Sequence, residues 1–248
     1  MRHLPRRLLD VLTFPEIERA LVVTAHPDDV DFGAAGTVAT LTDAGVHVTY
    51  CLVTDGDAGG SDRSIPRHDM AMLRRKEQTD AAAQVGVTDL FFLGHGDGRV
   101  QPTLQLRADI SAVIRRVRPR VVITQSPERN LDRIYASHPD HLAAGEAALC
   151  AVYPDARNPF AFPELFEEDL EPWAVDEVWV MGGSSGTHPI EVTAAVDRKI
   201  AALMCHVSQH PDPQRTATMV REWMANTAKQ FGLPDGASAE TFRVVDTR

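Results

Sequence analysis

Cysteines and long apolar runs are scarce in this chain, and each scarcity excludes a class of protein. The 248 residues include only three cysteines, at positions 51, 150 and 205. They are odd in number, lie far apart and form no Cys-x-x-Cys pair, which excludes a disulfide framework. We expect Cys51 and Cys150 to be reduced core thiols, as in a cytoplasmic protein. No apolar run approaches the ~20 residues of a membrane-spanning helix, so we expect no transmembrane segment.

A basic surface stripe is also missing, because acidic residues outnumber basic ones. Asp and Glu total 35 against 25 Lys and Arg, which gives a formal net charge of −10. Nucleic-acid binding depends on basic side chains that release counterions from phosphates, so we expect no nucleic-acid partner. A small neutral or sugar-like substrate remains compatible with this charge.

The N-terminal segment is the part of the chain that imitates a targeting sequence. Residues 1–14 are basic and then apolar, as a signal peptide would be. Arg6, Arg7 and Asp10 interrupt the apolar part, however, and no continuous apolar stretch follows. We therefore expect an amphipathic lead-in helix or arm.

The order of apolar runs and helical patterns in the first half of the chain predicts an α/β fold. Apolar, β-branched runs at residues 21–24, 46–53, 90–93 and 121–124 alternate with helical patterns at 33–44, 69–85, 104–117 and 139–152. Fully apolar strands separated by helices are typical of parallel sheets that are covered on both faces. With right-handed crossovers, this order predicts a Rossmann-like, three-layer, doubly wound and mostly parallel sheet.

The alternation weakens after residue 152, where we expect a smaller mixed α/β extension. Residues 153–172 are rich in Pro, Phe and acidic side chains, which indicates a loop excursion. Beyond it the pattern predicts strands at 175–181, 190–193 and 241–245, and helices at 196–209 and 216–231. The length of 248 residues suits one large domain.

Two short segments carry metal-ligand residue types at the spacing of one helical turn. Ala25–Asp29 (AHPDD) and Ser137–His141 (SHPDH) each lie beyond a predicted apolar strand. Side chains three residues apart in a first turn point the same way, so each segment presents a pair of ligands. In a doubly wound sheet the first and fourth strands are neighbours, and ligands bind beyond their carboxyl ends. The topology should therefore join the two segments, although about 110 residues separate them.

The joined segments offer the ligands of a catalytic metal and the groups that such a metal needs beside it. Two imidazoles and one carboxylate are a common ligand set for a divalent cation with open positions, and His26, Asp29 and one histidine of the second segment fit it. The cation would lower the pKa of a water toward ~7 and polarise a carbonyl. Asp28 is placed to remove the water's proton. The remaining histidine, if protonated, would stabilise an oxyanion, with Asp140 to orient it.

Three other interpretations of these segments are weaker. A carboxylate-only magnesium site, as in receiver domains, needs no histidine. Two histidines and a carboxylate also hold Fe²⁺ in oxygenases, but those enzymes usually have β-barrel scaffolds. A non-catalytic metal-binding protein would close its site with four protein ligands and would leave Asp28 without a purpose. We expect residues 1–155 to form the metal-binding catalytic core, and residues 156–248 to complete the same domain and cover the site.

Further segments add to these two a likeness to one enzyme family. The first segment is followed by Gly33–Thr37, and the second ends in His138–His141. Other matching segments are Thr54–Gly56, Arg74–Glu77, Gly94–Gly98, Asp197–Lys199 and His206–Gln209. Over about residues 20–210 the chain resembles the LmbE-like, or PIG-L, family of zinc-dependent N-deacetylases.

The resemblance implies roles that the spacing leaves open. It implies that His141 is the third ligand of Zn²⁺, with His26 and Asp29, and that Asp28 is the general base. Whether Zn²⁺ or Fe²⁺ occupies the site in the cell stays open. One departure from the family pattern is Val30, where an acid often follows the two aspartates.

The resemblance also implies roles for residues around the metal. His138 would be the charged histidine that stabilises the tetrahedral intermediate, with Asp140 as its partner. Arg74 and Asp97 would contact sugar hydroxyls, although a solvated helix charge and a plain turn residue are the alternatives.

The function implied is removal of an acetyl group from an N-acetylglucosamine-type sugar conjugate in the cytoplasm. The alternatives are an amidase that cleaves a mycothiol-like S-conjugate and a metal-binding protein without turnover. The partner would be a small amino-sugar conjugate, and the sequence leaves open whether the chain forms a homo-oligomer.

The remaining histidines and aromatic residues indicate structural roles. We expect three loop histidines, His95, His188 and His210, to face solvent, and His206 to be structural on a helix. The three tryptophans, Trp173, Trp179 and Trp223, are expected to be core or shielding residues rather than a platform for a sugar. Tyr135 is expected to pack rather than to reach the reacting carbonyl.

Overall fold

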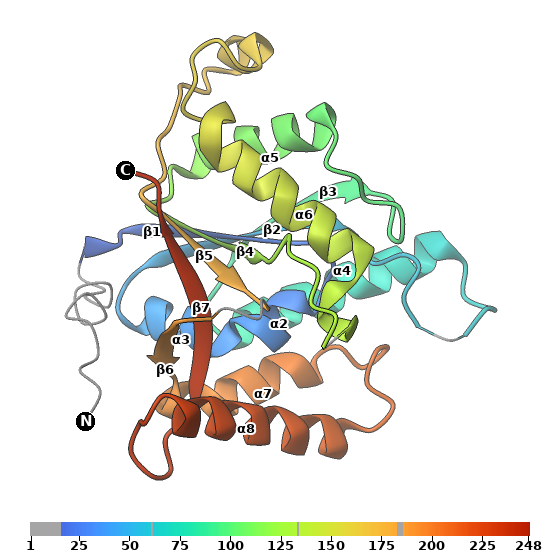
Figure 1. Cartoon of the computed structure of the whole chain (residues 1–248). Helices are drawn as coiled ribbons and strands as arrows, with labels where there is room; N and C mark the ends of the chain where they lie inside the picture. Colours follow the sequence, from blue (N-terminus) through green and yellow to red (C-terminus); the bar gives the residue numbers. More distant parts are fainter. Residues whose placement is uncertain (1–15, 61, 133, 183–185) are drawn as a thin grey trace.

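A seven-stranded, mostly parallel sheet runs through the centre of the structure, and helices cover both of its faces (Figure 1). This computed structural model describes residues 16–60, 62–132, 134–182 and 186–248. The lead-in helix or arm expected within residues 1–14 lies outside the described residues.

Strands and helices alternate in the first half of the described chain, as predicted. The elements are β1 (Arg19–Thr24), α2 (Asp29–Gly33), α3 (Ala35–Asp43), β2 (His47–Thr54), α4 (Arg67–Gln84), β3 (Asp89–His95), α5 (Leu104–Val117), β4 (Val121–Gln125), η2 (Ile134–Ser137) and α6 (Pro139–Cys150). The predicted bounds are correct to within two residues. The short helix α2 was not predicted as a separate element.

The C-terminal part adds strands to the same sheet. Its elements are η3 (Ala151–Asp155), η4 (Pro163–Glu168), β5 (Glu177–Met181), β6 (His188–Glu191), η5 (Thr193–Ala195), α7 (Val196–Met204), α8 (Pro213–Gln230) and β7 (Ala239–Asp246). The helix predicted over 196–209 ends at Met204 instead. The backbone turns there because the buried imidazole of His206 is hydrogen-bonded to Asp31, outside the helix.

The strand order is β3-β2-β1-β4-β5-β7-β6. β1 pairs in parallel with β2 on one side and with β4 on the other, so the winding reverses between β1 and β4. β5 is parallel to β4, and β7 is antiparallel to both β5 and β6. The predicted doubly wound, mostly parallel sheet with a mixed C-terminal extension is therefore confirmed.

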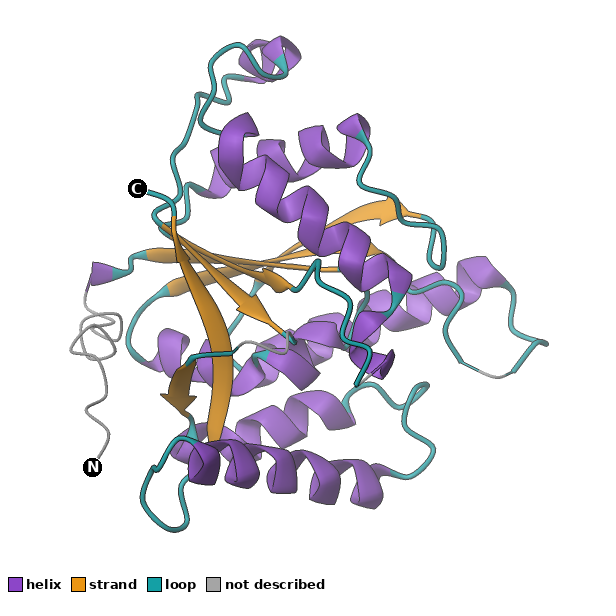
Figure 2. Cartoon of the chain, in the orientation of Figure 1, coloured by secondary structure: helices purple, strands orange, loops and turns teal. Residues whose placement is uncertain are grey.

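Alternate residues of the central strands belong to two separate cores. Ala20 and Val22 of β1 pack with α3, α4, α7 and α8, whereas Leu21 and Val23 pack with α5 and α6. Figures 1 and 2 show these helices on opposite sides of the strands. Burial of both faces explains why the strands are continuously apolar rather than alternating.

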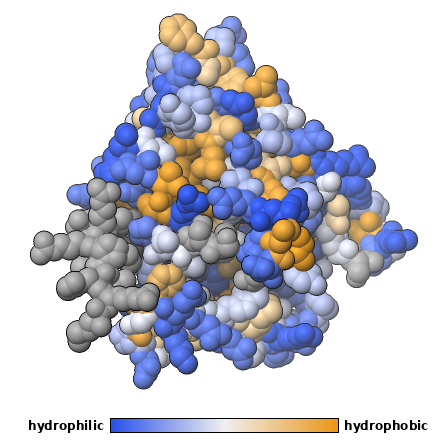
Figure 3. All heavy atoms as spheres, in the orientation of Figure 1, coloured by the Kyte–Doolittle hydropathy of each residue, from blue (hydrophilic) through white to orange (hydrophobic). Residues whose placement is uncertain are grey.

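The surface seen in the orientation of Figure 1 differs in hydropathy between its two halves. In the space-filling view, apolar side chains gather on the upper half, while hydrophilic side chains cover most of the lower half, over α8 (Figure 3). Within the described part of the chain, no helix combines the length and the apolar character needed to cross a membrane.

A glycine in α6 sets how closely this helix approaches β4. A Cβ atom built on Gly145 would lie 2.3 Å from the backbone oxygen of Gln125, which no real contact allows. Gly145 is buried, and the helix that it belongs to carries His138 and His141 at its start. The close approach therefore fixes where the second histidine-bearing segment lies.

We expect Gly145→Ala to lower the free energy of unfolding by about 1–3 kcal/mol, the usual cost of overpacking a buried contact. Helix propensity alone predicts the opposite sign, since Ala in a helix is about 1 kcal/mol more favourable than Gly. Urea unfolding monitored by circular dichroism distinguishes the two. The control is Glu146→Ala, at the exposed neighbouring position. If Gly145→Ala stabilised the protein, the close approach would not constrain α6.

Candidate metal centre

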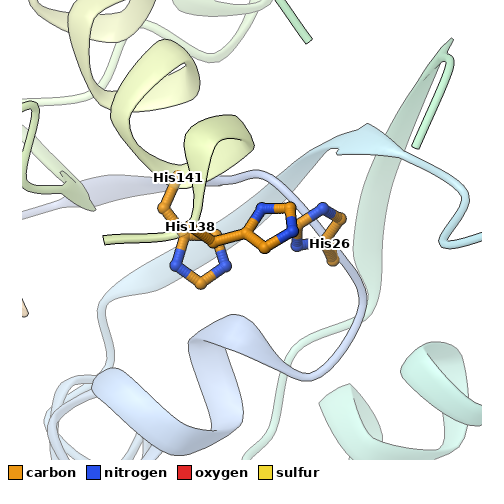
Figure 4. A group of neighbouring side chains, drawn as sticks. All are labelled: His26, His138 and His141. Atoms are coloured by element: carbon orange, nitrogen blue, oxygen red, sulfur yellow. The ribbon is translucent and has the colours of Figure 1, made fainter. Parts of the chain in front are cut away.

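The two histidine-bearing segments meet at the switch point of the sheet. His26 follows β1, His138 is the N-cap of α6, and His141 lies in the first turn of that helix. One ring nitrogen of each lies within 4.8 Å of the others. Figure 4 shows the three rings turned toward one another from the two segments. The convergence expected from the topology is therefore present in the structure.

Asp29 joins His26 to His141. Its Oδ2 lies 3.3 Å from His26 Nδ1 and accepts a hydrogen bond from the His26 backbone N–H at 2.7 Å. Its Oδ1 lies 2.9 Å from His141 Nε2. Asp29 thus contacts both of the other expected ligands. His138 lies beside them, with its ring centroid 5.0 Å from that of His26 and 5.3 Å from that of His141.

Asp140 contacts His26 rather than the ring of His138. Its Oδ2 lies 3.1 Å from His26 Nε2, and its two oxygens accept hydrogen bonds from the backbone N–H groups of Gly98 (2.7 Å) and Val100 (3.2 Å). Only its backbone N–H reaches His138, where it donates to Nδ1 at 3.2 Å. The expected pairing of the Asp140 carboxylate with His138 therefore needs correction, because the loop after β3 captures that carboxylate.

Asp97 approaches the same nitrogen of His26. Its Oδ1 lies 3.2 Å from Nε2, and its Oδ2 accepts a hydrogen bond from the Ala58 backbone N–H at 2.9 Å. Two carboxylates thus face Nε2, while Nδ1 faces Asp29. A second nitrogen held by carboxylates is the usual way to orient a ligating histidine.

The charges of this cluster suit a cation. Burial disfavours a charged imidazole, yet the charge of Asp29 and the hydrogen bonds that the ring donates to Asp140, Asp29 and Asp97 raise the pKa of His26 to about 12. Burial would raise the pKa of Asp29, but His141 and His26 hold it well below its usual range. A proton on His26 therefore balances negative charge that a divalent cation would balance instead. The imidazole and carboxylate donors fit Zn²⁺ or Fe²⁺.

Asp28 sits beside the cluster in an unusual backbone conformation. Its φ is +88°, which is rare for a residue other than glycine and marks strain at a functional site. Its backbone N–H donates to Gln78 Oε1 at 2.8 Å, and its Oδ2 accepts from Arg74 Nη2 at 2.9 Å. Burial raises the pKa of Asp28 to about 6, with Arg74 acting in the opposite direction. Such a carboxylate can accept a proton near neutral pH.

Arg74 is bound to the protein itself in this structure. It is only 4% exposed, and its guanidinium donates to the backbone oxygens of Pro27 and Gly56 as well as to Asp28. The sequence led us to expect a contact with sugar hydroxyls. The contacts of Arg74 hold the first segment against α4, and its contact with a sugar stays a prediction.

The contacts among three residues of this site were not predicted from the sequence. Gln78 Nε2 donates to Asp31 Oδ2 at 2.9 Å, and His206 Nε2 lies 2.8 Å from the same oxygen. Asp31 and His206 are fully buried, so this pair is shielded from solvent. Gln78 therefore connects the pair to the backbone of Asp28. The sequence signal that could have found Gln78 is its spacing from Arg74. The two residues are four positions apart and therefore lie on the same face of α4.

The histidine expectations need two corrections. His206, expected on a helix, lies beyond the end of α7 at Met204. His210 is buried, with its ring 5.5 Å from that of Phe32, so the prediction that it faces solvent is wrong. His210 follows the turn at His206, whose ring is hydrogen-bonded to Asp31, and it therefore packs against Phe32 of α2. His95 and His188 are partly exposed.

The aromatic expectations are confirmed only in part. Trp179 is in the core at 1% exposure, and Trp173 is half-buried. Trp223 is 39% exposed and Tyr135 is 92% exposed, so neither is a core residue. Tyr135 was expected to pack, and that prediction is wrong because the short helix η2 carries it at the surface.

An imidazole–carboxylate cluster with a carboxylate beside it that is not itself a ligand is the arrangement that activates water for attack. Fold and site together define a metal-dependent hydrolase. The PIG-L family, described as GlcNAc-PI de-N-acetylase, matches residues 21–152, and the chain belongs to this family. The resemblance noted in the sequence is thereby confirmed.

Two relatives and one solved structure extend this result. Diacetylchitobiose deacetylase of Thermococcus kodakarensis is 31% identical over 199 residues, 80% of this chain and 73% of that protein. A probable N-acetyl-alpha-D-glucosaminyl L-malate deacetylase 2 of Bacillus cereus is 34% identical over 196 residues, 76% of this chain and 82% of that protein. The structure of N,N'-diacetylchitobiose deacetylase from Pyrococcus horikoshii is 26% identical, with a TM-score of 0.87 over 98% of this chain and 90% of that chain.

Proposed function

We propose that this chain is a Zn²⁺-dependent N-deacetylase that removes the acetyl group from an N-acetylated amino sugar or its conjugate. The observation that carries the proposal is Asp28, held in a strained conformation beside the cluster of His26, Asp29 and His141. The relatives support the substrate class, since both are named as deacetylases of acetylated amino sugars.

His26, Asp29 and His141 would hold the cation, which when bound supplies a Lewis acid for the amide carbonyl and a water of lowered pKa. Asp28 accepts the proton of the attacking water. Arg74 fixes the direction of that carboxylate through the hydrogen bond to Oδ2. Asp140 and Asp97 keep the ring of His26 in place through Nε2.

His138 donates a hydrogen bond to the reacting group from Nε2. Its Nδ1 accepts the backbone N–H of Asp140, so that nitrogen carries no proton and the remaining ring proton is on Nε2. An imidazole with no proton on Nδ1 is neutral. We therefore propose a neutral donor in place of the charged histidine that the resemblance implies.

The two alternatives drawn from the sequence receive no support. The named relatives are deacetylases of amino sugars, which does not favour an amidase for a mycothiol-like conjugate. They do not favour a metal-binding protein without turnover either.

The first test is metal-dependent release of acetate from N-acetylglucosamine and N,N'-diacetylchitobiose. We expect turnover to fall below about one hundredth after complete chelation, because the metal-activated water is lost. Adding back Zn²⁺, Fe²⁺ or Mg²⁺ separately identifies the cation that restores activity. Turnover that persists in a sample shown by elemental analysis to hold no metal would end the proposal.

We further propose that the two parts of the chain have the different roles expected from the sequence. Residues 1–155 supply the ligands and the base, and residues 156–248 cover the site with α7, α8 and β7. The three free cysteines support a reducing compartment, and we propose a cytoplasmic enzyme.

A further inference from the structure

A series of buried hydrogen bonds connects the backbone of Asp28 to the C-terminal part of the chain. His206 Nε2 donates to Asp31 Oδ2 at 2.8 Å, and Gln78 Nε2 donates to the same oxygen at 2.9 Å. Gln78 Oε1 then accepts the backbone N–H of Asp28 at 2.8 Å. We call His206, Asp31 and Gln78 the support residues. Each of them is 0% exposed, so each polar group depends on its protein partner rather than on water.

The two ends of the Gln78 amide are fixed by the groups that they face. A backbone N–H can only donate, so the carbonyl end of the amide must face Asp28. The NH₂ end must then face an acceptor, which is Asp31 Oδ2. If the amide were turned over, its NH₂ would oppose the N–H of Asp28, and its oxygen would oppose the carboxylate of Asp31. Asp31 therefore selects the orientation of Gln78 that holds Asp28.

Asp28 depends on this partner because of its backbone conformation. A φ of +88° persists in a residue other than glycine only where the surroundings hold it. Arg74 holds the carboxylate of Asp28 through Oδ2, and Gln78, one turn further along α4, holds its backbone N–H. Because the backbone sets the direction in which a side chain leaves it, both contacts determine where the carboxylate points.

The turn that carries His206 is itself bound to α4. Glu77 accepts hydrogen bonds from the backbone N–H of Ser208 at 2.8 Å and from its hydroxyl at 2.7 Å. The helices α4 and α7 pack against each other on one face of the sheet (Figure 1). His206 is therefore placed against Asp31 by contacts outside the metal centre. The segment His206–Gln209, noted in the sequence, has a structural connection to the base through this histidine.

We propose that the support residues His206, Asp31 and Gln78 are positioning residues for the hydrolytic step, because they hold the backbone of Asp28 so that its carboxylate faces the attacking water. This inference rests on the proposed function, in which Asp28 is the base. The support residues are fully buried and therefore do not contact the substrate. Their loss should lower kcat and leave KM and metal content unchanged.

The first test is Gln78→Met, which removes the link to Asp28 and keeps the length of the side chain. We expect kcat for N-acetylglucosamine to fall by about tenfold or more, since a small misplacement of a catalytic group can cost about 100-fold. The matched control is Gln84→Met, at the exposed end of the same helix, for which kcat should stay within about twofold. An unchanged kcat in Gln78→Met would overturn the proposal.

His206 is tested by two amides of different length. In His206→Gln the side-chain NH₂ can occupy the place of Nε2 and donate to Asp31, whereas in His206→Asn the shorter side chain ends near the place of Nδ1. We expect His206→Asn to lose about fivefold or more in kcat, and His206→Gln to keep most of it. Both variants leave a polar amide in the same buried position. Equal kcat values in the two would show that the hydrogen bond to Asp31 does not position the base.

A merely structural role is recognised by repeating Gln78→Met in the Asp28→Asn background. Residues that act as one unit have effects that do not add, so the remaining kcat should fall less than about twofold there. If Gln78→Met caused the same loss in both backgrounds, Gln78 would act by a route other than Asp28, and the proposal would be wrong.

Hydrogen exchange separates this inference from the proposed function, since it needs no turnover. We expect the exchange rate of the Asp28 N–H, measured by NMR on isotope-labelled protein, to rise by about tenfold or more in Gln78→Met and His206→Asn. The amides of β1 are the control for general unfolding and should not change. If the wild type releases no acetate but the Asp28 N–H responds, the proposed function fails and the support residues stand. If acetate is released but neither kcat nor this exchange rate changes, the support residues have no positioning role.

Discussion

Asp28→Asn should leave the protein folded and able to bind its metal, while acetate release falls by about 10²–10⁴-fold, the range that a positioned general base contributes. Asn has the size of Asp and can still accept the hydrogen bond from Arg74 Nη2, so the strained backbone keeps its partners. It cannot take the proton of the attacking water. The measurement is kcat for N-acetylglucosamine together with the metal content of the purified variant.

A matched change elsewhere on the surface controls for the loss of one negative charge. Asp80→Asn removes a carboxylate of α4 that pairs with Lys76 and is half exposed. Its turnover should stay within about twofold, since an exposed pair of this kind contributes little. If Asp28→Asn kept the turnover of Asp80→Asn with a full complement of metal, another group would have to be the base.

The position of the metal centre could be predicted because it depends on topology. Apolar strands alternating with helices predict the sheet, and the reversal of winding predicts that β1 and β4 are neighbours. Pro139 in the first turn of α6 predicts that His138 and His141 begin a helix, as they do. These inferences use only local pattern and connectivity, which one sequence contains.

The partners of the site residues could not be predicted, because they depend on loops that come from elsewhere in the chain. Asp140 is adjacent to His138 in sequence, yet the backbone N–H groups of Gly98 and Val100 draw its carboxylate toward His26. The burial of His206 likewise depends on Asp31, which lies 175 residues away.

The strained backbone of Asp28 could not be predicted from the sequence either. Its φ of +88° has no sequence signal, since a glycine would be the usual residue at such a position. Gln78 accepts the N–H that this conformation presents. A residue of α4 therefore holds the backbone of the proposed base, and sequence proximity gives no indication of that.

The two histidines of α6 should respond differently to removal. His141→Ala should lose most of its metal, because His141 Nε2 lies 2.9 Å from Asp29 Oδ1 and the two side chains are proposed to bind the same cation. His138→Ala should keep its metal and lose about 10²–10³-fold in kcat, the usual cost of removing one donor to a developing oxyanion. Both variants are measured by elemental analysis after dialysis and by acetate release at saturating Zn²⁺.

Asp140→Asn distinguishes a partner of His26 from a partner of His138. Because its carboxylate faces His26 Nε2, the change should weaken metal binding by about 10–100-fold, which is typical for a group that orients a ligating histidine. A partner of His138 would instead lower kcat and leave metal affinity unchanged. Titration with Zn²⁺ under competition from a chelator gives the affinity, and kcat at saturating metal gives the other quantity. If His138→Ala rather than His141→Ala released the metal, the roles of the two histidines would be exchanged.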